Sequence, residues 1–228
     1  MSGIRIFGLR LIPPLWFVKG LPKTLWFNFK YFNFKDAIKL PVFVSNRVWL
    51  MELGGNVKLG IVRTGVVRIG FNDIGIFDRQ RSRTIWQVSG TVEFEGSASI
   101  GHGSKISVIG NLVIGNNFCI SAESSIIAHK KITIGDDVLL SWDILIMDTD
   151  IHEIYDESGL CINQPKAVII GNNVWVGCRS LILKGVEIAN GVVVAANTTL
   201  TKPINTNNSI VGGNPVRVLK DKIVAVKW

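Results

Sequence analysis

The sequence contains little cysteine and histidine, three residues of each in 228. Cys119, Cys161 and Cys178 form no C-x-x-C pair and are odd in number, so neither a disulfide framework nor a zinc ribbon fits them. We therefore expect a protein of a reducing, cytoplasmic setting, with no metal.

Long apolar runs are also missing. No uncharged stretch approaches the roughly 20 apolar residues that a membrane-spanning helix needs. The apolar segment Leu11–Val18 is short and is interrupted by Pro13 and Pro14, which makes it a poor core for a signal peptide.

Acidic residues are almost absent from the first fifty positions, where Asp36 stands against eight lysines and arginines. This segment has a net charge of +7 and holds 11 of the 20 aromatic residues, whereas the other 178 residues carry a net charge of only +1. Its four prolines predict that it does not form one long helix, and those prolines are Pro13, Pro14, Pro22 and Pro41.

Two interpretations of this basic, aromatic segment compete. It packs as a cap on the main domain or on a neighbouring subunit, or it lies on an anionic membrane surface, where each nearby lysine or arginine contributes about 1 kcal/mol. Nucleic-acid binding is a third possibility, but no recognisable nucleic-acid fold supports it.

The rest of the chain contains an internal repeat. Aliphatic or aromatic residues recur in steps of six, with a step of eight after each of the first two triples and a step of 24 after the third. The triples are Phe94, Ile100, Ile106, then Ile114, Ile120, Ile126, then Ile134, Leu140, Ile146, and the series resumes at Ile170, Val176, Ile182, Ile188, Val194, Leu200.

A period of six fits a β-coil with three short faces, in which each face directs one aliphatic side chain inward. Gly, Asn and Asp, which tolerate left-handed backbone conformations, then turn the corners, as in the repeated IGNN and IGDD segments. Successive coils pair as parallel strands about 4.8 Å apart. An ordinary β-sandwich does not explain fifteen positions in register.

This pattern resembles the hexapeptide repeat of left-handed parallel β-helix acyltransferases, over roughly residues 57–220. The resemblance is strongest to galactoside, maltose and nodulation-type O-acetyltransferases and to polysaccharide O-acetyltransferases. It implies an all-β fold and a homotrimer that binds acetyl-CoA between subunits. The expected organisation is a basic-aromatic segment at 1–50, a β-helix at 51–212 with an extruded loop at 147–169, and a CoA-proximal tail at 213–228.

The 24-residue step between Ile146 and Ile170 contains His152 among several acidic residues. In the family that this chain resembles, a histidine at this place removes the proton from the acceptor hydroxyl while the oxygen attacks the thioester. Imidazole suits this role because it titrates near neutral pH, and such general-base catalysis gives a rate gain of roughly 10²–10⁴. Asp148 or Asp150 is expected to orient it.

The resemblance also implies a track of residues that bind acetyl-CoA. Trp175 walls the pantetheine channel, Cys178 stands where relatives often have serine, and Ala196 lets the pantetheine arm lie close to the coil. Residues that resemble the family's terminal motifs are expected near the CoA phosphates, where cations are favoured, and these are Thr201, Lys202, Arg217 and Lys220.

The sequence departs from the galactoside enzymes at the acceptor positions, which here hold Ser121 and His129. The N-terminal segment also lacks the helical cap typical of that group. Both differences favour a glycan, or a lipid-linked glycan at the inner face of the cytoplasmic membrane, as the acceptor.

Other functions remain open at this level. Acetylation of an antibiotic or free sugar would leave much the same signature, and histidine can also deprotonate an amine. A γ-type carbonic anhydrase shares the coil but needs two closely spaced histidines, whereas His102, His129 and His152 are 27 and 23 residues apart. A purely structural β-helix leaves the extruded loop unexplained.

Overall fold

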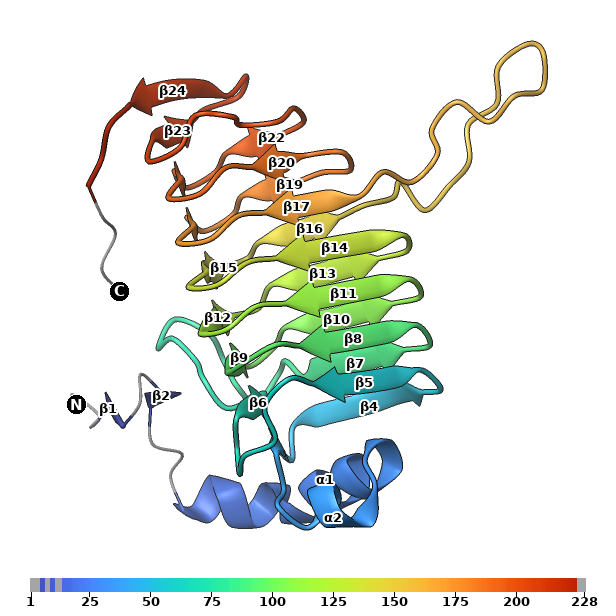
Figure 1. Cartoon of the computed structure of the whole chain (residues 1–228), viewed down its shortest axis with the longest axis vertical. Helices are drawn as coiled ribbons and strands as arrows, with labels where there is room; N and C mark the ends of the chain where they lie inside the picture. Colours follow the sequence, from blue (N-terminus) through green and yellow to red (C-terminus); the bar gives the residue numbers. More distant parts are fainter. Residues whose placement is uncertain (1–4, 7–8, 11–13, 225–228) are drawn as a thin grey trace.

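The computed structural model describes residues 5–6, 9–10 and 14–224, which form a three-faced parallel β-coil with one helical end (Figure 1). The chain passes in turn through three parallel sheets, here called faces III, I and II. Each turn of the coil adds one strand to each sheet.

Face I consists of β4 (Val48–Leu53), β7 (Thr84–Val88), β10 (Lys105–Val108), β13 (Ser125–Ala128), β16 (Leu145–Met147), β19 (Leu181–Ile182) and β22 (Thr199–Leu200). Face II consists of β5 (Asn56–Leu59), β8 (Thr91–Phe94), β11 (Asn111–Ile114), β14 (Lys131–Ile134), β17 (Val168–Ile170) and β20 (Glu187–Ile188). Face III consists of β3 (Val42–Val44), β6 (Val67–Ile69), β9 (Ala98–Ile100), β12 (Phe118–Ala122), β15 (Leu139–Trp142), β18 (Trp175–Val176), β21 (Val193–Val194), β23 (Ile210–Gly212) and β24 (Arg217–Lys220).

The predicted repeat positions form the core of this coil. All fifteen are at most 2% exposed, and each stacks on its counterpart in the next coil, as Ile106 does on Ile126 and Ile126 on Ile146. The two eight-residue steps both fall between faces I and II, at the corner that we call I–II. The other corners are named in the same way.

Corners are turned as the sequence predicts, by residues in the left-handed region. At corner II–III, Asn117, Asp137 and Asn173 occupy one position in successive coils with φ of 55–57°. Their side chains also join neighbouring coils, since the Asn117 amide donates to Asp137 Oδ1 at 2.7 Å. Asn and Asp therefore both permit the turn and connect one turn to the next.

The N-terminal segment differs from the prediction, because it contains one long helix. Helix α1 (Pro14–Tyr31) includes Pro22, and the short α2 (Phe34–Ala37) follows it. Pro14 stands in the first turn, where its missing N–H has no partner to lose, and Pro22 is tolerated inside the helix despite its usual cost. Two further short strands, β1 (Arg5–Ile6) and β2 (Leu9–Arg10), pair antiparallel before it.

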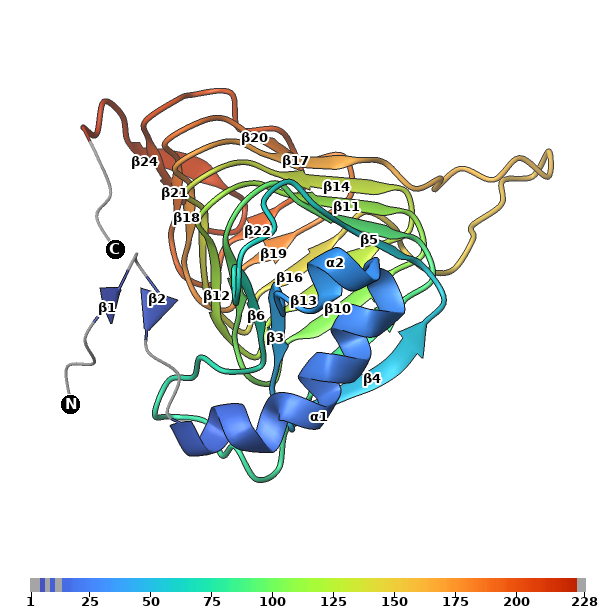
Figure 2. The ribbon, with the colours of Figure 1, turned by 60° about the horizontal axis from the view of Figure 1, so that its bottom comes forward.

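Helix α1 covers the first turn of the coil, so the helical cap judged missing from the sequence is present (Figures 1 and 2). Thr24 Oγ1 accepts from the Val44 amide at 2.9 Å, and Asn28 accepts from the Val42 amide at 3.1 Å and donates to its carbonyl at 2.7 Å. These side chains satisfy the backbone of edge strand β3, which has no preceding coil.

The coil begins before its expected boundary, and its last parallel strand, β23, ends at Gly212. Strands β3 and β4 already belong to faces III and I, so the first coil begins at Val42, within the segment expected at residues 1–50. At the other end, β24 turns back and pairs antiparallel with β23, closing the exposed edge of face III. None of the described helices is long and apolar enough to cross a membrane.

Candidate active site

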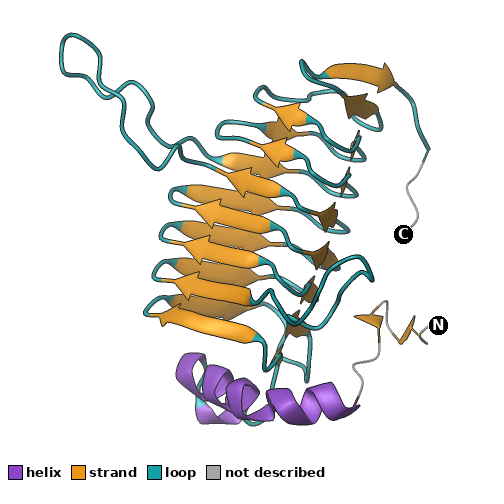
Figure 3. Ribbon diagram, turned by 180° about the vertical axis from the view of Figure 1, so that it is seen from behind, coloured by secondary structure: helices purple, strands orange, loops and turns teal. Residues whose placement is uncertain are grey.

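The histidine loop leaves the coil at corner I–II, between β16 and β17, and projects well beyond the prism (Figures 1 and 3). Its outer part is a narrow hairpin, with Tyr155 and Cys161 forming an antiparallel bridge and the Ile162 amide donating to the Ile154 carbonyl at 2.8 Å. His152 lies on the segment of the loop that leads away from the coil, and its side chain is exposed.

Asp148 fixes the base of the loop and does not orient His152, which corrects one of the two expectations for the aspartates. Its carboxylate is fully buried and accepts hydrogen bonds from the backbone amides of His129, Lys130 and Lys131 at 2.7–2.8 Å. It thereby holds corner I–II of the preceding coil against the first residues of the loop.

Asp150 belongs to a second set of contacts closer to His152. Its Oδ2 accepts from Lys184 Nζ and from the Asn163 amide at 2.9 Å. The same Asn163 amide donates to the His152 carbonyl at 2.8 Å. The Lys184 ammonium and, secondly, Asn163 lower the pKa of the Asp150 carboxyl, which therefore remains ionised at neutral pH.

This network acts on the backbone of His152. Lys184 also donates to the Asn163 carbonyl at 2.8 Å, so one lysine ties together the outgoing and returning strands of the loop. The His152 carbonyl and the neighbouring backbone are thus held against the coil. Asp150 is therefore linked to the His152 carbonyl through the Asn163 side chain, and its carboxylate is bonded to Lys184 and Asn163.

The residues expected to bind the pantetheine arm lie elsewhere in the chain, on face III and corner III–I. Trp175 is 38% exposed on the outer side of face III, and its indole N–H donates to Ser141 Oγ at 3.1 Å. Cys178 and Ala196 hold the same position in successive coils at corner III–I. The two coils approach closely beside this position, because a Cβ on Gly177 would lie 2.6 Å from the Ala196 nitrogen.

The four residues expected near the CoA phosphates are divided between two regions and are exposed. Thr201 and Lys202 follow β22 at corner I–II, where Lys202 stands one coil above Lys184. Arg217 and Lys220 lie on β24, beside face III. One chain therefore does not bring the whole expected set together.

The two expected acceptor residues are also apart. Ser121 lies on the outer side of face III, one coil before Ser141. His129 lies at corner I–II, directly below the loop, with its amide bound to Asp148. Of these two residues, only His129 shares a corner with His152.

The loop surface is unusually apolar for a projecting hairpin. Five large apolar side chains are each more than half exposed, namely Ile151, Ile154, Tyr155, Leu160 and Ile162. Exposed apolar groups gathered in this way mark surfaces that contact a partner.

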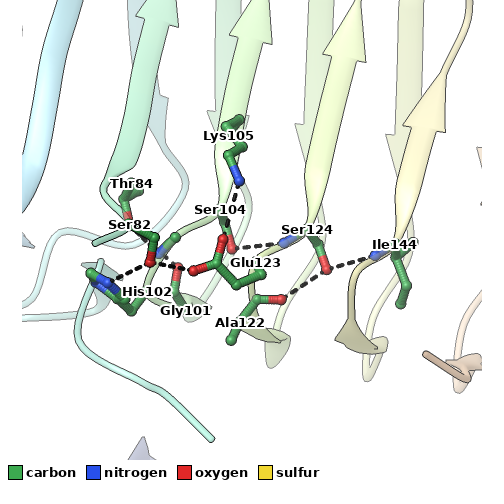
Figure 4. Close-up of polar contacts among 11 residues, drawn as sticks. Ser82, Thr84, Gly101, His102, Ser104, Lys105, Ala122, Glu123, Ser124 and Ile144 are labelled. Atoms are coloured by element: carbon green, nitrogen blue, oxygen red, sulfur yellow. Dashed lines mark hydrogen bonds and ion pairs between the residues drawn. The ribbon is translucent and has the colours of Figure 1, made fainter. Parts of the chain in front are cut away.

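The third histidine, His102, belongs to a separate polar network at corner III–I (Figure 4). Its Nε2 lies 3.1 Å from Ser82 Oγ, whose hydroxyl donates to Glu123, and Glu123 pairs with Lys105 at 3.1 Å. Since the Ser82 proton points to Glu123, His102 donates from Nε2. Its buried Nδ1 has no hydrogen-bond partner among the described residues.

Burial and then the nearby Arg79 lower the pKa of His102, so it is neutral at pH 7. The charged groups that face it are Arg47, Asp73, Arg79 and Glu123. These contacts connect the coil to residues 70–83, a long insertion between β6 and β7. The residues described here contain no cluster of three or more His, Cys, Asp or Glu suited to a metal ion.

Three residues of the candidate site were not anticipated, namely Ser141, Asn163 and Lys184. Lys184 had a detectable signal, because it stands two positions after inward Ile182, as Lys202 does after Leu200. The contacts of Asn163 and Ser141 depend on how the loop folds back and how the Trp175 ring turns, and the repeat encodes neither.

Comparison with known proteins agrees with this architecture. Residues 167–202 match the family described as Bacterial transferase hexapeptide (six repeats). The solved structure of NeuO, a polySia-specific acetyltransferase, superposes with a TM-score of 0.60 over 81% of this chain and 91% of its own, at 23% identity. The coil is a left-handed parallel β-helix of hexapeptide repeats. The fold and the resemblance inferred from the sequence are both confirmed.

Relatives in sequence are named as acetyltransferases. Galactoside O-acetyltransferase of Escherichia coli (strain K12) is 33% identical over 113 residues, which are 49% of this chain and 54% of that protein. Polysialic acid O-acetyltransferase of Neisseria meningitidis is 47% identical over 66 residues, 28% of this chain and 31% of its own. The match thus spans about half of the first relative's length and less than a third of the second's.

A longer alignment joins the chain to the putative lipopolysaccharide biosynthesis O-acetyl transferase WbbJ of Escherichia coli (strain K12). It is 28% identical over 143 residues, 58% of this chain and 72% of that protein.

Proposed function

We propose that the protein is an acetyl-CoA-dependent O-acetyltransferase that modifies a sugar hydroxyl of an envelope polysaccharide or its lipid-linked precursor. The observation that carries this proposal is the histidine loop. A rigid coil is interrupted once at corner I–II, and the interruption presents His152 on a backbone held by Lys184 and Asn163. The names of the polysaccharide-modifying relatives support the acceptor class.

The separation of the site residues supports an active site shared between subunits of a homotrimer. His152 projects from corner I–II, whereas Trp175, Cys178 and Ala196 lie on face III and corner III–I of the same prism. Around a threefold axis, the loop of one subunit reaches the next subunit. There its apolar side chains are covered and His152 meets the bound thioester.

Acetyl transfer then follows from general-base chemistry. The acceptor hydroxyl oxygen attacks the thioester carbonyl carbon while the His152 imidazole takes the hydroxyl proton. The carbon–sulfur bond of the resulting tetrahedral intermediate breaks, and the imidazolium returns the proton to the CoA thiolate. Ester and free CoA are the products, and no metal is needed.

The remaining predicted residues have binding roles in this scheme. Trp175, Cys178 and Ala196 line the path of the pantetheine arm, and Ser121 and His129 meet the acceptor. The CoA phosphates pair with the cations Lys202, after β22, and Arg217 and Lys220, on β24, and Thr201 lies beside Lys202 in the same CoA-binding set. A position at the inner face of the cytoplasmic membrane gives such an enzyme access to lipid-linked glycans.

The decisive experiment compares wild-type protein with His152→Ala, using acetyl-labelled CoA and surface glycan extracted from a strain that lacks the gene. We expect transfer of label to the glycan to fall by about 10²–10⁴-fold in the variant, with acetyl-CoA affinity unchanged. Glu157→Gln, on the exposed hairpin tip, is the matched control and retains activity.

Near wild-type transfer by His152→Ala would disprove the assignment of the base. Failure of wild-type protein to bind acetyl-CoA in a calorimetric titration would disprove the whole proposal.

A further inference from the structure

Helix α1 has two faces of different character. The face toward the coil carries Gly20, Thr24, Phe27 and Asn28, which are buried and hold strand β3. Gly20 is required there, because a Cβ would lie 2.5 Å from the Val44 carbonyl oxygen. This contact fixes the helix and determines which side chains point away from the protein.

The outward side is an apolar stripe at helical spacing. Its members are Leu15, Val18, Leu25, Trp26 and Phe29, which are 40–62% exposed. Phe34 and Ile38 in and after α2 extend the stripe and are 73% and 54% exposed. We call these seven residues the apolar face. Exposed apolar side chains gathered in one patch mark a surface that contacts a protein or a membrane.

Cations surround the apolar face. Lys19, Lys30, Lys35 and Lys39 are exposed within the same segment, and its single acid, Asp36, is paired with Lys39 at 3.1 Å. This charge pattern selects an anionic occupant. A second protein chain is a poorer match, since lysine is depleted from the centres of protein interfaces.

We propose that the apolar face docks on an anionic lipid bilayer. Trp and Phe side chains of an amphipathic helix insert at the level of the headgroups while lysines contact acidic lipids, each strengthening binding about fivefold. In the proposed contact α1 lies along the surface, which agrees with its not being long and apolar enough to cross a membrane.

The position of α1 makes this docking compatible with catalysis. The helix lies across the end of the coil, and the histidine loop leaves from the other half of the prism (Figures 1 and 2). If the chain is a trimer, as proposed above, three apolar faces lie at the same end of the threefold axis. Three weak contacts then act together, with the coil standing upright on the bilayer.

The test is co-sedimentation of the full-length protein with vesicles of phosphatidylcholine, with and without phosphatidylglycerol. We expect binding only to the vesicles with phosphatidylglycerol, and weakening with added salt. The double variant Trp26→Glu/Phe29→Glu should bind at least tenfold more weakly. Ile169→Glu, an equally drastic change at a 43% exposed side chain on face II, is the matched control and should bind as wild type.

A second pair of variants separates charge from apolar insertion. Lys30→Glu/Lys35→Glu should lose the preference for phosphatidylglycerol, and His152→Ala should bind vesicles normally, so failure of the catalytic proposal does not affect this result. Equal binding to both kinds of vesicle, no binding at all, or undiminished binding of Trp26→Glu/Phe29→Glu would overturn the proposal. Loss of oligomeric mass in that variant would also overturn it, because a second copy then covers the face.

Discussion

Replacing Asp148 tests whether this aspartate is part of the frame or part of the catalytic apparatus. Asp148→Ala removes a fully buried carboxylate that accepts three backbone hydrogen bonds at 2.7–2.8 Å. Hydrogen bonds to a charged acceptor contribute about 1.5–3 kcal/mol each, so three of them set an upper bound of about 9 kcal/mol. Lys130 and Lys131 are exposed, and their amides regain water in the variant. We therefore expect a loss of about 3–5 kcal/mol in the free energy of unfolding.

The measurement is urea unfolding followed by circular dichroism, at one fixed protein concentration so that any coupling to assembly is constant. Asp148→Asn keeps one carbonyl oxygen in place and should lose about half as much free energy. Asp143→Asn is the control, since this exposed aspartate makes only a 3.8 Å ion pair with Arg179, asparagine also tolerates its left-handed backbone, and the loss should be less than about 1 kcal/mol.

The same variants distinguish the two roles by activity. If Asp148 oriented the His152 imidazole, Asp148→Asn would lower kcat strongly and leave the free energy of unfolding near wild type. That outcome, or a loss below about 1 kcal/mol for Asp148→Ala, would refute the structural role argued from the three amide bonds.

Two further predictions concern the coil itself. Because burial lowers the pKa of His102, the unfolded chain binds more protons than the folded protein below about pH 6.5, so stability should fall as pH decreases through that value. His102→Gln should flatten this part of a stability profile measured by urea unfolding, and an unchanged slope would contradict the assignment. Gly177→Val should lower the free energy of unfolding by about 2 kcal/mol or more, since even a Cβ would lie 2.6 Å from the Ala196 nitrogen. Gly75→Ala, where a Cβ meets nothing within 4 Å, is its control in thermal unfolding.

The regular part of the coil was predictable because its physics is local and periodic. One inward side chain per face fixes the step of six, and each of the fifteen positions found in the sequence is buried in the structure. The series of inward positions at steps of six was not found before Phe94, for a physical reason. The step from inward Ile69 to inward Trp86 is 17 residues, where the ordinary step is six, and this breaks the regular spacing.

The sequence did not predict helix α1, because its prolines disfavour a helix and the tertiary contact that stabilises this helix is not visible in the sequence. Thr24 and Asn28 satisfy the backbone of an edge strand, and this stabilises the helix around Pro22. The first interpretation of the segment holds for one side of α1, which caps the coil, and the membrane interpretation stays a prediction. The outward side is what the bilayer experiment addresses.

The site was predictable as a position in the chain and less so as a geometry. A 24-residue step located the histidine loop, but Asp148 and Asp150, which are two residues apart, proved to have different partners. Sequence spacing does not reveal which carboxylate turns into the coil and which faces the returning strand.

The two long insertions in the coil show how a hexapeptide scaffold can carry function without losing its register. Both occur at corners, where no inward side chain or ladder hydrogen bond is displaced. The insertion at 70–83 lies at corner III–I and is tied down, with Arg79 over the Trp16 ring at 3.8 Å and Ser82 bonded to His102. The histidine loop has comparable anchors only at its base, through Asp148 and Lys184, and its hairpin leaves five apolar side chains exposed. An insertion that is anchored at the base and apolar at the tip is suited to packing against a second subunit, which covers its apolar side chains. The corner that accepts two extra residues in two earlier coils is therefore the place from which the loop of the proposed shared active site projects.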